Sequence, residues 1–196
     1  MKELLKKVTE GQNLTREEAA KAMDMMLEGT ASPVLVSAFL TALRMKGETI
    51  NEIVGCTEMM KSKGGSVKLD TDEYIDFVGT GGDGANSFNI STTSMFVCAA
   101  AGVTVAKHGN RAASSKSGAS DLLEALGANI MLEPKQVEQC INETGMGFMN
   151  AMKFHKAMKN VGPIRKEIGI RTIFNMLGPL SNPSNASRQV IGVFSP

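Results

Sequence analysis

Two loops rich in glycine, serine and charged side chains carry the residues of this sequence that could do chemistry. Residues 79–84 read GTGGDG, and residues 107–120 read KHGNRAASSKSGAS. Glycines let a backbone approach a ligand closely, and free N–H groups at a helix start attract anions. Serine hydroxyls and the cations Lys107 and Arg111 add hydrogen-bond donors. The two loops together therefore predict a cradle for a polyanion such as a phosphate or pyrophosphate compound.

Each loop follows a β-rich apolar segment and precedes a helical one. Residues 74–78 (YIDFV) lead into the first loop, and a helix is expected over residues 91–101 after it. Residues 103–106 (VTVA) lead into the second loop, and a short helix is expected over residues 121–126 before Gly127. Two consecutive β–loop–α units imply a parallel sheet, and its ligands bind outside the carboxyl ends of the strands.

Other phosphate-binding motifs fit less well, and a single glycine-rich loop is often only a tight turn. The first loop matches the dinucleotide pattern GxGxxG, but the last glycine of that pattern should open a helix, here expected near Ser91. An acidic residue should end the second strand of such a fold, whereas Lys107 and His108 stand there. Gly84 is followed by Ala85 and not by the lysine of a Walker P-loop. A nicotinamide enzyme is therefore disfavoured, and a P-loop is excluded.

The residues around both loops resemble the anthranilate phosphoribosyltransferase family, within the nucleoside phosphorylase/phosphoribosyltransferase fold family. The resemblance runs along the whole chain, through residues 76–83, 89–92 (NIST), 107–111 (KHGNR), 114–115 (SS), 121–127, 154–155 (FH), 161–165 (VGPIR) and 171–183 (RTIFNMLGPLSNP). The related pyrimidine nucleoside phosphorylases share the fold and the first loop. Their second loop does not usually read KHGNR followed by SS, so this loop makes the match specific.

The resemblance implies an enzyme of tryptophan biosynthesis, a pentosyltransferase. Its family moves the phosphoribosyl group of 5-phosphoribosyl 1-pyrophosphate to the amine of anthranilate, through an oxocarbenium-like transition state. Such chemistry needs a neutralised leaving group and an aligned amine more than a covalent nucleophile, so no catalytic nucleophile is assigned. Two alternatives stay open: a pyrimidine nucleoside phosphorylase of the same fold, and a phosphate-binding protein without catalytic activity.

The resemblance also assigns residues to ligands. The phosphoribosyl pyrophosphate set is Gly79, Gly82, Asp83, Ser87, Asn89, Ile90, Ser91, Thr92, Lys107, His108, Gly109, Asn110, Arg111, Ala112, Ala113, Ser114, Ser115 and Ala119. The anthranilate set is Gly79, Asn110 and Arg165. Arg165 follows Pro163 in a stretch predicted to be a loop, and its guanidinium can pair bidentately with a carboxylate. Ser91 is expected to bind Mg²⁺, because a hydroxyl at a phosphate-binding helix start commonly reaches the metal. His155 is expected to be structural rather than catalytic.

The sequence departs from the family at its end. Members of the family continue well past the position of Pro196, and an adjacent Asp–Glu pair in that later part binds magnesium with the hydroxyl that matches Ser91. The one Asp–Glu pair here, Asp72-Glu73, precedes the first strand. We therefore expect the chain to be the amino-terminal part of the enzyme, truncated within its α/β domain and weakly active at most.

Residues 1–66 are predicted to form a small domain of four helices. The signals are capping-box pairs, a Ser-Pro helix start and glycine stops, namely Thr15 with Glu18, Thr49 with Glu52, Ser32-Pro33, Gly29, Gly47 and Gly64. Apolar residues recur at helical spacing and predict an internal core. The resemblance implies a homodimer through this domain, which residues 160–182 are a candidate to rejoin.

Residues 67–196 are predicted to form the α/β domain that binds phosphoribosyl pyrophosphate, after a linker at residues 63–66 (KGGS). Pro134 opens a helix that runs to Gly145, and short strands follow over residues 146–149 and 189–194. The fold class is therefore α/β, with a small N-terminal helical domain and a mostly parallel sheet that is incomplete.

Composition narrows the class of protein only broadly. The chain has 196 residues, is 42% hydrophobic and carries a formal net charge of +1, which is typical of a globular protein and gives no basic face for nucleic acid. The cysteines Cys56, Cys98 and Cys140 lack metal-ligand spacing, so reduced thiols in the cytoplasm are expected. Neither a signal peptide nor a membrane-spanning run is recognisable. The expected partners are therefore small-molecule substrates and a second copy, not a membrane.

Overall fold

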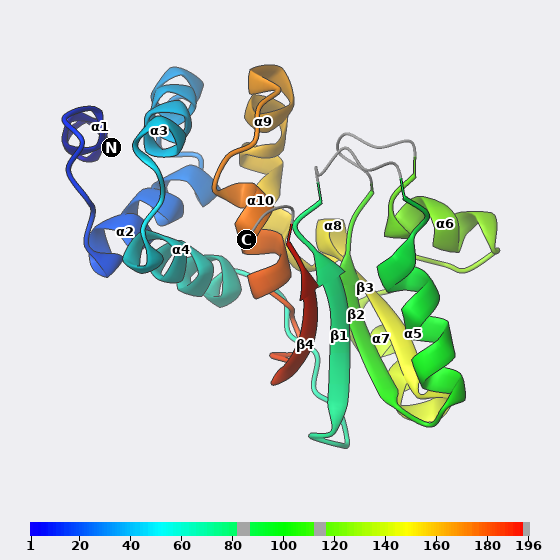
Figure 1. Cartoon of the computed structure of the whole chain (residues 1–196). Helices are drawn as coiled ribbons and strands as arrows, with labels where there is room; N and C mark the ends of the chain where they lie inside the picture. Colours follow the sequence, from blue (N-terminus) through cyan, green and yellow to red (C-terminus); the bar gives the residue numbers. More distant parts are fainter. Residues whose placement is uncertain (82–86, 112–116, 194–196) are drawn as a thin grey trace. The chain divides into compact units, whose positions relative to one another are not determined.

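The computed structural model of this chain describes residues 1–81, 87–111 and 117–193. The chain divides into two compact units (Figure 1). One unit combines Met1–Gly64 with His155–Ser181, and the other combines Gly65–Phe154 with Asn182–Pro196. The chain therefore passes from one unit to the other three times.

The first unit is built from helices. They are α1 (Lys2–Thr9), α2 (Arg16–Leu27), α3 (Pro33–Lys46), α4 (Ile50–Ser62), the 3₁₀ helix η1 (Lys156–Asn160), α9 (Gly162–Ile168) and α10 (Phe174–Leu180). The four predicted N-terminal helices are confirmed, and their starts have the predicted chemistry. Thr15 and Thr49 each close a capping box, and the hydroxyl of Ser32 accepts a hydrogen bond from the backbone N–H of Leu35.

The later helices of this unit correct one prediction. Arg165 lies in helix α9 and not in a loop. Pro163 stands in the first turn of α9, where its fixed φ suits a helix, and Gly169 ends the helix at φ 66. Those two signals were present in the sequence and should have predicted the helix.

One buried cluster draws on both parts of the first unit. Among the residues that contribute are Met23, Met26, Phe39, Leu40, Leu43, Cys56, Val161, Ile173, Phe174 and Leu177. The pKa of the Cys56 thiol is raised to about 12, mainly by burial, so this cysteine is an inert core residue. Residues 161–177 thus complete a core that the first 64 residues begin.

The second unit is a parallel sheet with helices on both faces (Figure 1). The strands β1 (Tyr74–Gly79), β2 (Thr104–Gly109), β3 (Met146–Asn150) and β4 (Arg188–Gly192) lie in the order β3-β2-β1-β4, and all three neighbouring pairs are parallel. The helices of this unit are α5 (Ile90–Ala100), α6 (Ala119–Ala125), α7 (Pro134–Thr144) and α8 (Ala151–Phe154). The predicted parallel sheet is confirmed.

Neighbouring residues of β2 show how the two faces are filled. Val105 packs with Phe77 and with Met95 of α5, whereas Ala106 packs with Val137 and other residues of α7. Successive side chains of a strand point to opposite faces, so α5 and α7 cover the sheet from opposite sides.

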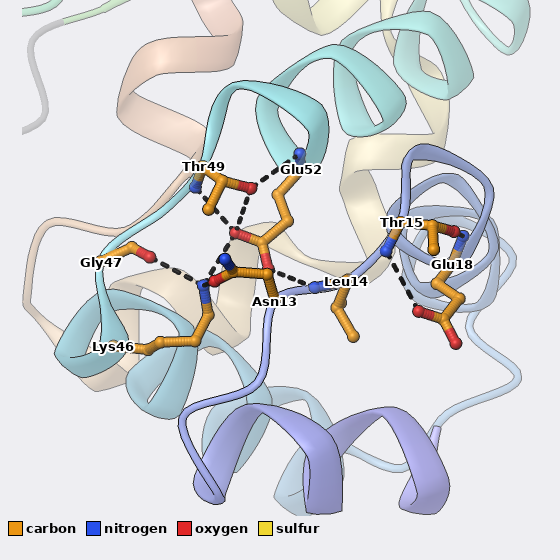
Figure 2. A network of polar contacts seen from close by, with 8 residues as sticks. All are labelled: Asn13, Leu14, Thr15, Glu18, Lys46, Gly47, Thr49 and Glu52. Atoms are coloured by element: carbon orange, nitrogen blue, oxygen red, sulfur yellow. Dashed lines mark hydrogen bonds and ion pairs between the residues drawn. The ribbon is translucent and has the colours of Figure 1, made fainter.

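A buried carboxylate holds three segments of the helical unit together (Figure 2). The Oε1 atom of Glu52 accepts a hydrogen bond from the backbone N–H of Leu14 at 2.9 Å. Its Oε2 atom accepts from the N–H and hydroxyl of Thr49, at 2.7 and 3.0 Å, and from the Nζ of Lys46 at 2.9 Å. Burial opposes ionisation, but these hydrogen bonds outweigh it and keep the pKa of Glu52 below its ordinary value.

We predict that Glu52→Gln destabilises the protein strongly. The amide adds N–H donors where Thr49 and Lys46 already donate, and Lys46 loses its buried partner. Disrupting one side of a buried, hydrogen-bonded ion pair costs on the order of 3 kcal/mol. Urea unfolding followed by circular dichroism measures the change. Glu58→Gln is the control, because Glu58 pairs with Arg16 at a position that is 50% exposed. Equal losses in the two variants would contradict the assignment.

The same carboxylate predicts an acid dependence of stability. A group whose folded pKa is lowered stabilises the protein above its unfolded pKa, and that contribution disappears as the pH falls through the folded pKa. We therefore expect the difference in unfolding free energy between wild type and Glu52→Gln to shrink on the acid side of the ordinary glutamate range. Urea titrations at a series of acidic pH values test this; a constant difference would refute it.

Candidate functional site

The candidate site lies where β1 and β2 end and helices α5 and α6 begin. The parallel sheet places both strand ends at one edge, as the sequence predicted. Six of the predicted substrate residues lie outside the described part of the chain, namely Gly82, Asp83, Ala112, Ala113, Ser114 and Ser115. The others flank those two segments.

One hydrogen bond joins the ends of the two loops. The side-chain Nδ2 of Asn89, the N-cap residue of α5, donates to the Oγ of Ser117 at 3.1 Å. Ser117 stands immediately before Gly118, the N-cap residue of α6. The structure therefore places the start of α5, which follows the first loop, beside the last described part of the second loop.

The start of α5 presents the predicted Asn-Ile-Ser-Thr segment. The helix begins at Ile90, one residue before the predicted start. The carbonyl of Asn89 accepts hydrogen bonds from the backbone N–H groups of Thr92 and Thr93, at 3.1 and 2.9 Å. Thr92 is buried, whereas Ser91 is half-buried and Ser87 is exposed. Ser91 therefore places a hydroxyl in the first helical turn, at the positive end of the helix dipole.

Lys107, predicted to bind pyrophosphate, is only 3% exposed, and its Nζ donates to the carbonyl of Phe77 in β1. Burial lowers the pKa of Lys107 to about 8, against the attraction of Asp76. This cation therefore lies within the sheet beneath the second loop.

Arg111, the other predicted cation of the second loop, is held by helix α6. Its guanidinium contacts Asp121 at 2.9 Å and Glu124 at 2.6 Å. Hydrogen bonds to Glu124 and Asp121 raise the pKa of Arg111. All three side chains are partly exposed, so these ion pairs are open to water.

The segment between these two cations is tightly packed. His108 is buried, and Gly109 leaves no room for a side chain, since an added Cβ would lie 2.7 Å from the Cε2 of Phe148. Asn110 accepts a hydrogen bond from the N–H of Arg111 on its Oδ1 at 2.8 Å, and its carbonyl accepts from the N–H of Ser120 at 3.4 Å. Ala119 begins α6. The conformation at the start of the second loop is thus fixed by its neighbours.

Sequence reasoning gave no role to Asp76, a fully buried acid in the middle of β1. Its Oδ1 accepts a hydrogen bond from the N–H of His108 at 3.1 Å, and its Oδ2 accepts from the Nε2 of Gln189 at 3.3 Å. Burial raises the pKa of Asp76, while a hydrogen bond from Asn182 opposes the rise. An acid inside an otherwise apolar strand was the signal that could have identified it.

The predicted anthranilate residues are divided between the two units. Gly79 and Asn110 lie at the loop edge of the sheet, whereas Arg165 lies in α9 of the helical unit. The guanidinium of Arg165 stacks over the ring of Phe174 with its Cζ 5.0 Å from the centroid, and burial lowers the pKa of this arginine.

His155, expected to be structural, is buried in the helical unit. One of its ring nitrogens, Nε2, lies 3.1 Å from the carbonyl of Ser181, and burial lowers the pKa of the imidazole. An added Cβ at Gly64 would lie 3.0 Å from the other ring nitrogen. These contacts agree with a structural role.

The residues that the structure describes show neither a cluster of metal ligands nor a membrane-spanning helix. They contain no group of three or more His, Cys, Asp or Glu side chains that could hold a metal ion. Nor do they include a helix long and apolar enough to span a membrane.

Comparisons with known proteins match both units. A model described as "Glycosyl transferase family, helical bundle domain" matches residues 2–64. A second, described as "Glycosyl transferase family, a/b domain", matches residues 71–196. The curated anthranilate phosphoribosyltransferase of Acetivibrio thermocellus is 57% identical over 196 residues, which cover 100% of this chain and 57% of that relative.

Two solved structures extend the comparison. Anthranilate phosphoribosyltransferase from Thermus thermophilus superposes with a TM-score of 0.92 at 46% identity, over 98% of this chain and 59% of that one. The Saccharomyces cerevisiae enzyme in complex with PRPP and Mg superposes with a TM-score of 0.85 at 32% identity, over 93% and 55%. The chain therefore spans somewhat more than half the length of these proteins.

The tight packing at Gly109 predicts that Gly109→Ala destabilises the α/β unit. The new methyl group would overlap the ring of Phe148, and overpacking of this kind costs about 1 to 3 kcal/mol. Adding Phe148→Leu should recover part of the loss, which a double-mutant cycle in urea measures. Gly192→Ala is the control in the same sheet, because its Cβ would have only ordinary contacts, the nearest at 3.8 Å. Strictly additive losses would show that the overlap is not the cause.

Proposed function

The chain belongs to the glycosyl transferase family, and from that membership we propose that it transfers a phosphoribosyl group. The donor is 5-phosphoribosyl 1-pyrophosphate and the acceptor is the amine of anthranilate, so that N-(5-phosphoribosyl)anthranilate and pyrophosphate are formed. The names of the relatives support these substrates. The observation that carries the proposal is the meeting of the two loops at Asn89 and Ser117.

The proposed site for phosphoribosyl pyrophosphate is the loop edge of the sheet. Asn89, Ser91 and Thr92 supply polar groups at the start of α5, an eleven-residue helix whose positive end favours an anion. Lys107 contributes a buried ammonium held in place within the sheet, and Arg111 contributes an exposed guanidinium. Exposed ion pairs are weak, so Arg111 can exchange Asp121 and Glu124 for a diphosphate at little expense.

The acceptor is positioned by a second set of residues. The family resemblance assigns the carboxylate of anthranilate to Arg165, and it assigns Asn110 and Gly79 to the same substrate. Phe174 fixes the guanidinium of Arg165 by stacking, which lowers the entropy lost on binding. The amine then attacks the anomeric carbon as pyrophosphate leaves, and no residue of the chain has to form a covalent bond.

Magnesium fits this proposal as an ion shared with the ligand. The hydroxyl of Ser91 is one hard oxygen donor at the phosphate-binding helix start, and diphosphate oxygens and water are the usual further ligands of Mg²⁺. When bound, the ion would neutralise charge on the leaving pyrophosphate.

Two further expectations belong to the same proposal, a homodimer and a cytoplasmic location. The helical unit exposes the apolar side chains of Val34, Met45 and Ile50, which are 78%, 82% and 80% exposed. Contact with a second copy would remove that surface from water, as the family resemblance implies.

An activity assay tests the proposed function directly. Loss of anthranilate fluorescence in the presence of phosphoribosyl pyrophosphate and Mg²⁺ reports the transfer. Phosphorolysis of a pyrimidine nucleoside without transfer would overturn the proposal in favour of a nucleoside phosphorylase. Calorimetric binding of phosphoribosyl pyrophosphate without either reaction would indicate a binding protein.

Arg111→Ala is predicted to weaken the binding of phosphoribosyl pyrophosphate about tenfold, the loss expected for one charge-assisted contact. Glu124→Gln should strengthen binding, because it releases one of the two partners of Arg111. Calorimetric titration measures both. Lys135→Ala is the matched control, since it also removes one exposed cation, in α7. Unchanged affinity in Arg111→Ala would remove this residue from the site.

Arg165→Ala is predicted to raise the KM for anthranilate and to reduce discrimination between anthranilate and aniline, since only anthranilate has a carboxylate. Loss of one charge-assisted contact corresponds to about tenfold or more. Lys166→Ala, the neighbouring exposed cation of α9, is the control. If Arg165 acts only by packing on Phe174, its variant will melt at a lower temperature and keep its selectivity.

A further inference from the structure

We propose that Asp76 is a positioning residue for the diphosphate group of the substrate, acting through Lys107 and His108 at the start of the second loop. The inference rests on the proposed function, because it requires a polyanion at that loop. Asp76 is fully buried, so its action must pass through neighbouring protein groups.

Strands β1 and β2 are joined by their backbones near the strand starts and by side chains near the strand ends. Backbone pairs of β1 with β2 near the strand starts are Tyr74 with Thr104 and Ile75 with Val105. The register of β1 with β4, and that of β2 with β3, each cover five positions up to the strand ends. The carboxyl-terminal halves of β1 and β2, which carry the two loops, are also linked through side chains.

Side chains supply the links in that region. The carboxylate of Asp76 reaches from β1 to the backbone N–H of His108 in β2 at 3.1 Å. In the opposite direction, the ammonium of Lys107 donates to the carbonyl of Phe77. Asn182 adds a third link, since it hydrogen-bonds to Asp76 of β1 and donates to the carbonyl of Ala106 in β2 at 3.0 Å. Two of the three links involve residues that carry charge, so the loop start depends on charges buried within the sheet.

The charge of Lys107 depends on burial and on Asp76. Burial lowers its pKa to about 8, and Asp76 is the charged group that opposes this effect. Around these two residues, α5 contributes Met95 to the buried cluster on one face and packs Cys98 against it, and Gln189 of β4 contacts the carboxylate. The imidazole of His108, next to Lys107, is also buried. Asp76 therefore favours the charged form of the Lys107 ammonium.

The charge of Lys107 makes the affinity for a diphosphate depend on pH. The attraction of a protonated lysine for a diphosphate is present below its pKa and is lost as the pH rises through it. For the wild-type protein that loss is expected near pH 8, from the pKa of Lys107. Without the charge of Asp76 the same loss should occur at a lower pH, because burial then acts unopposed.

The test is calorimetric titration of Asp76→Asn with phosphoribosyl pyrophosphate, and separately with inorganic pyrophosphate, from about pH 6 to about pH 9. Asparagine keeps an oxygen that can accept the N–H of His108, so the variant removes mainly the charge. We expect affinities within about twofold of wild type at the acid end and about three- to tenfold weaker affinity near neutral to mildly alkaline pH. A merely structural role would weaken binding evenly across the range.

Glu73→Gln is the control, because it removes one acid of the same strand region that is 79% exposed and paired with Arg188. If Asp76→Asn does not fold, Lys107→Gln in the wild-type background decides, since it should abolish the loss of pyrophosphate binding near pH 8. The proposal would be overturned if the pH profile of binding in Asp76→Asn coincided with that of wild type. It would also be overturned if Lys107→Gln still lost pyrophosphate binding near pH 8. Pyrophosphate binding with the expected profile but no transfer to anthranilate would instead overturn the proposed function alone.

Discussion

The parallel direction of all four strands is the constraint on which the candidate site depends. Parallel strands send every following loop to the same edge of the sheet, so β1 and β2 deliver their polar loops side by side. The hydrogen bond between Asn89 and Ser117 is a local consequence of that arrangement. Coverage by α5 and α7 on opposite faces then excludes water from the strands beneath.

Each unit contains a buried acid and a buried lysine, Glu52 with Lys46 and Asp76 with Lys107, and the two pairs differ in their contacts. Glu52 contacts Lys46 directly at 2.9 Å, and additional N–H and O–H donors make its ionised form stable. Asp76 acts on Lys107 without an ion-pair contact, and burial shifts the pKa of both groups toward their neutral forms. The first arrangement locks helices together, whereas the second leaves a cation whose charge state responds to its surroundings.

Local signals in the sequence predicted the parts of this fold that depend on short-range chemistry. The capping boxes at Thr15 and Thr49 predicted where two helices begin. The glycine after each β–loop–α unit predicted where a helix ends, to within a residue or two. The partners of Lys107 and Arg111 could not be predicted, because they come from another strand and another helix. Burial of Asp76 likewise depends on three separate segments of chain. Arg165 was predicted to lie in a loop, although Pro163 and Gly169 are the start and stop signals of a helix of only seven residues.

The division of the helical unit between Met1–Gly64 and His155–Ser181 has a consequence for synthesis on the ribosome. Val161, Phe174 and Leu177 must reach a core begun more than a hundred residues earlier, so that core stays open until strands β1 to β3 have emerged. The backbone N–H of Gly65 meets the carbonyl of Phe154 at 2.7 Å, so folding of the intervening segment brings its ends together. The nascent sheet thereby lowers the entropic cost of loop closure, which would otherwise delay completion of the helical core.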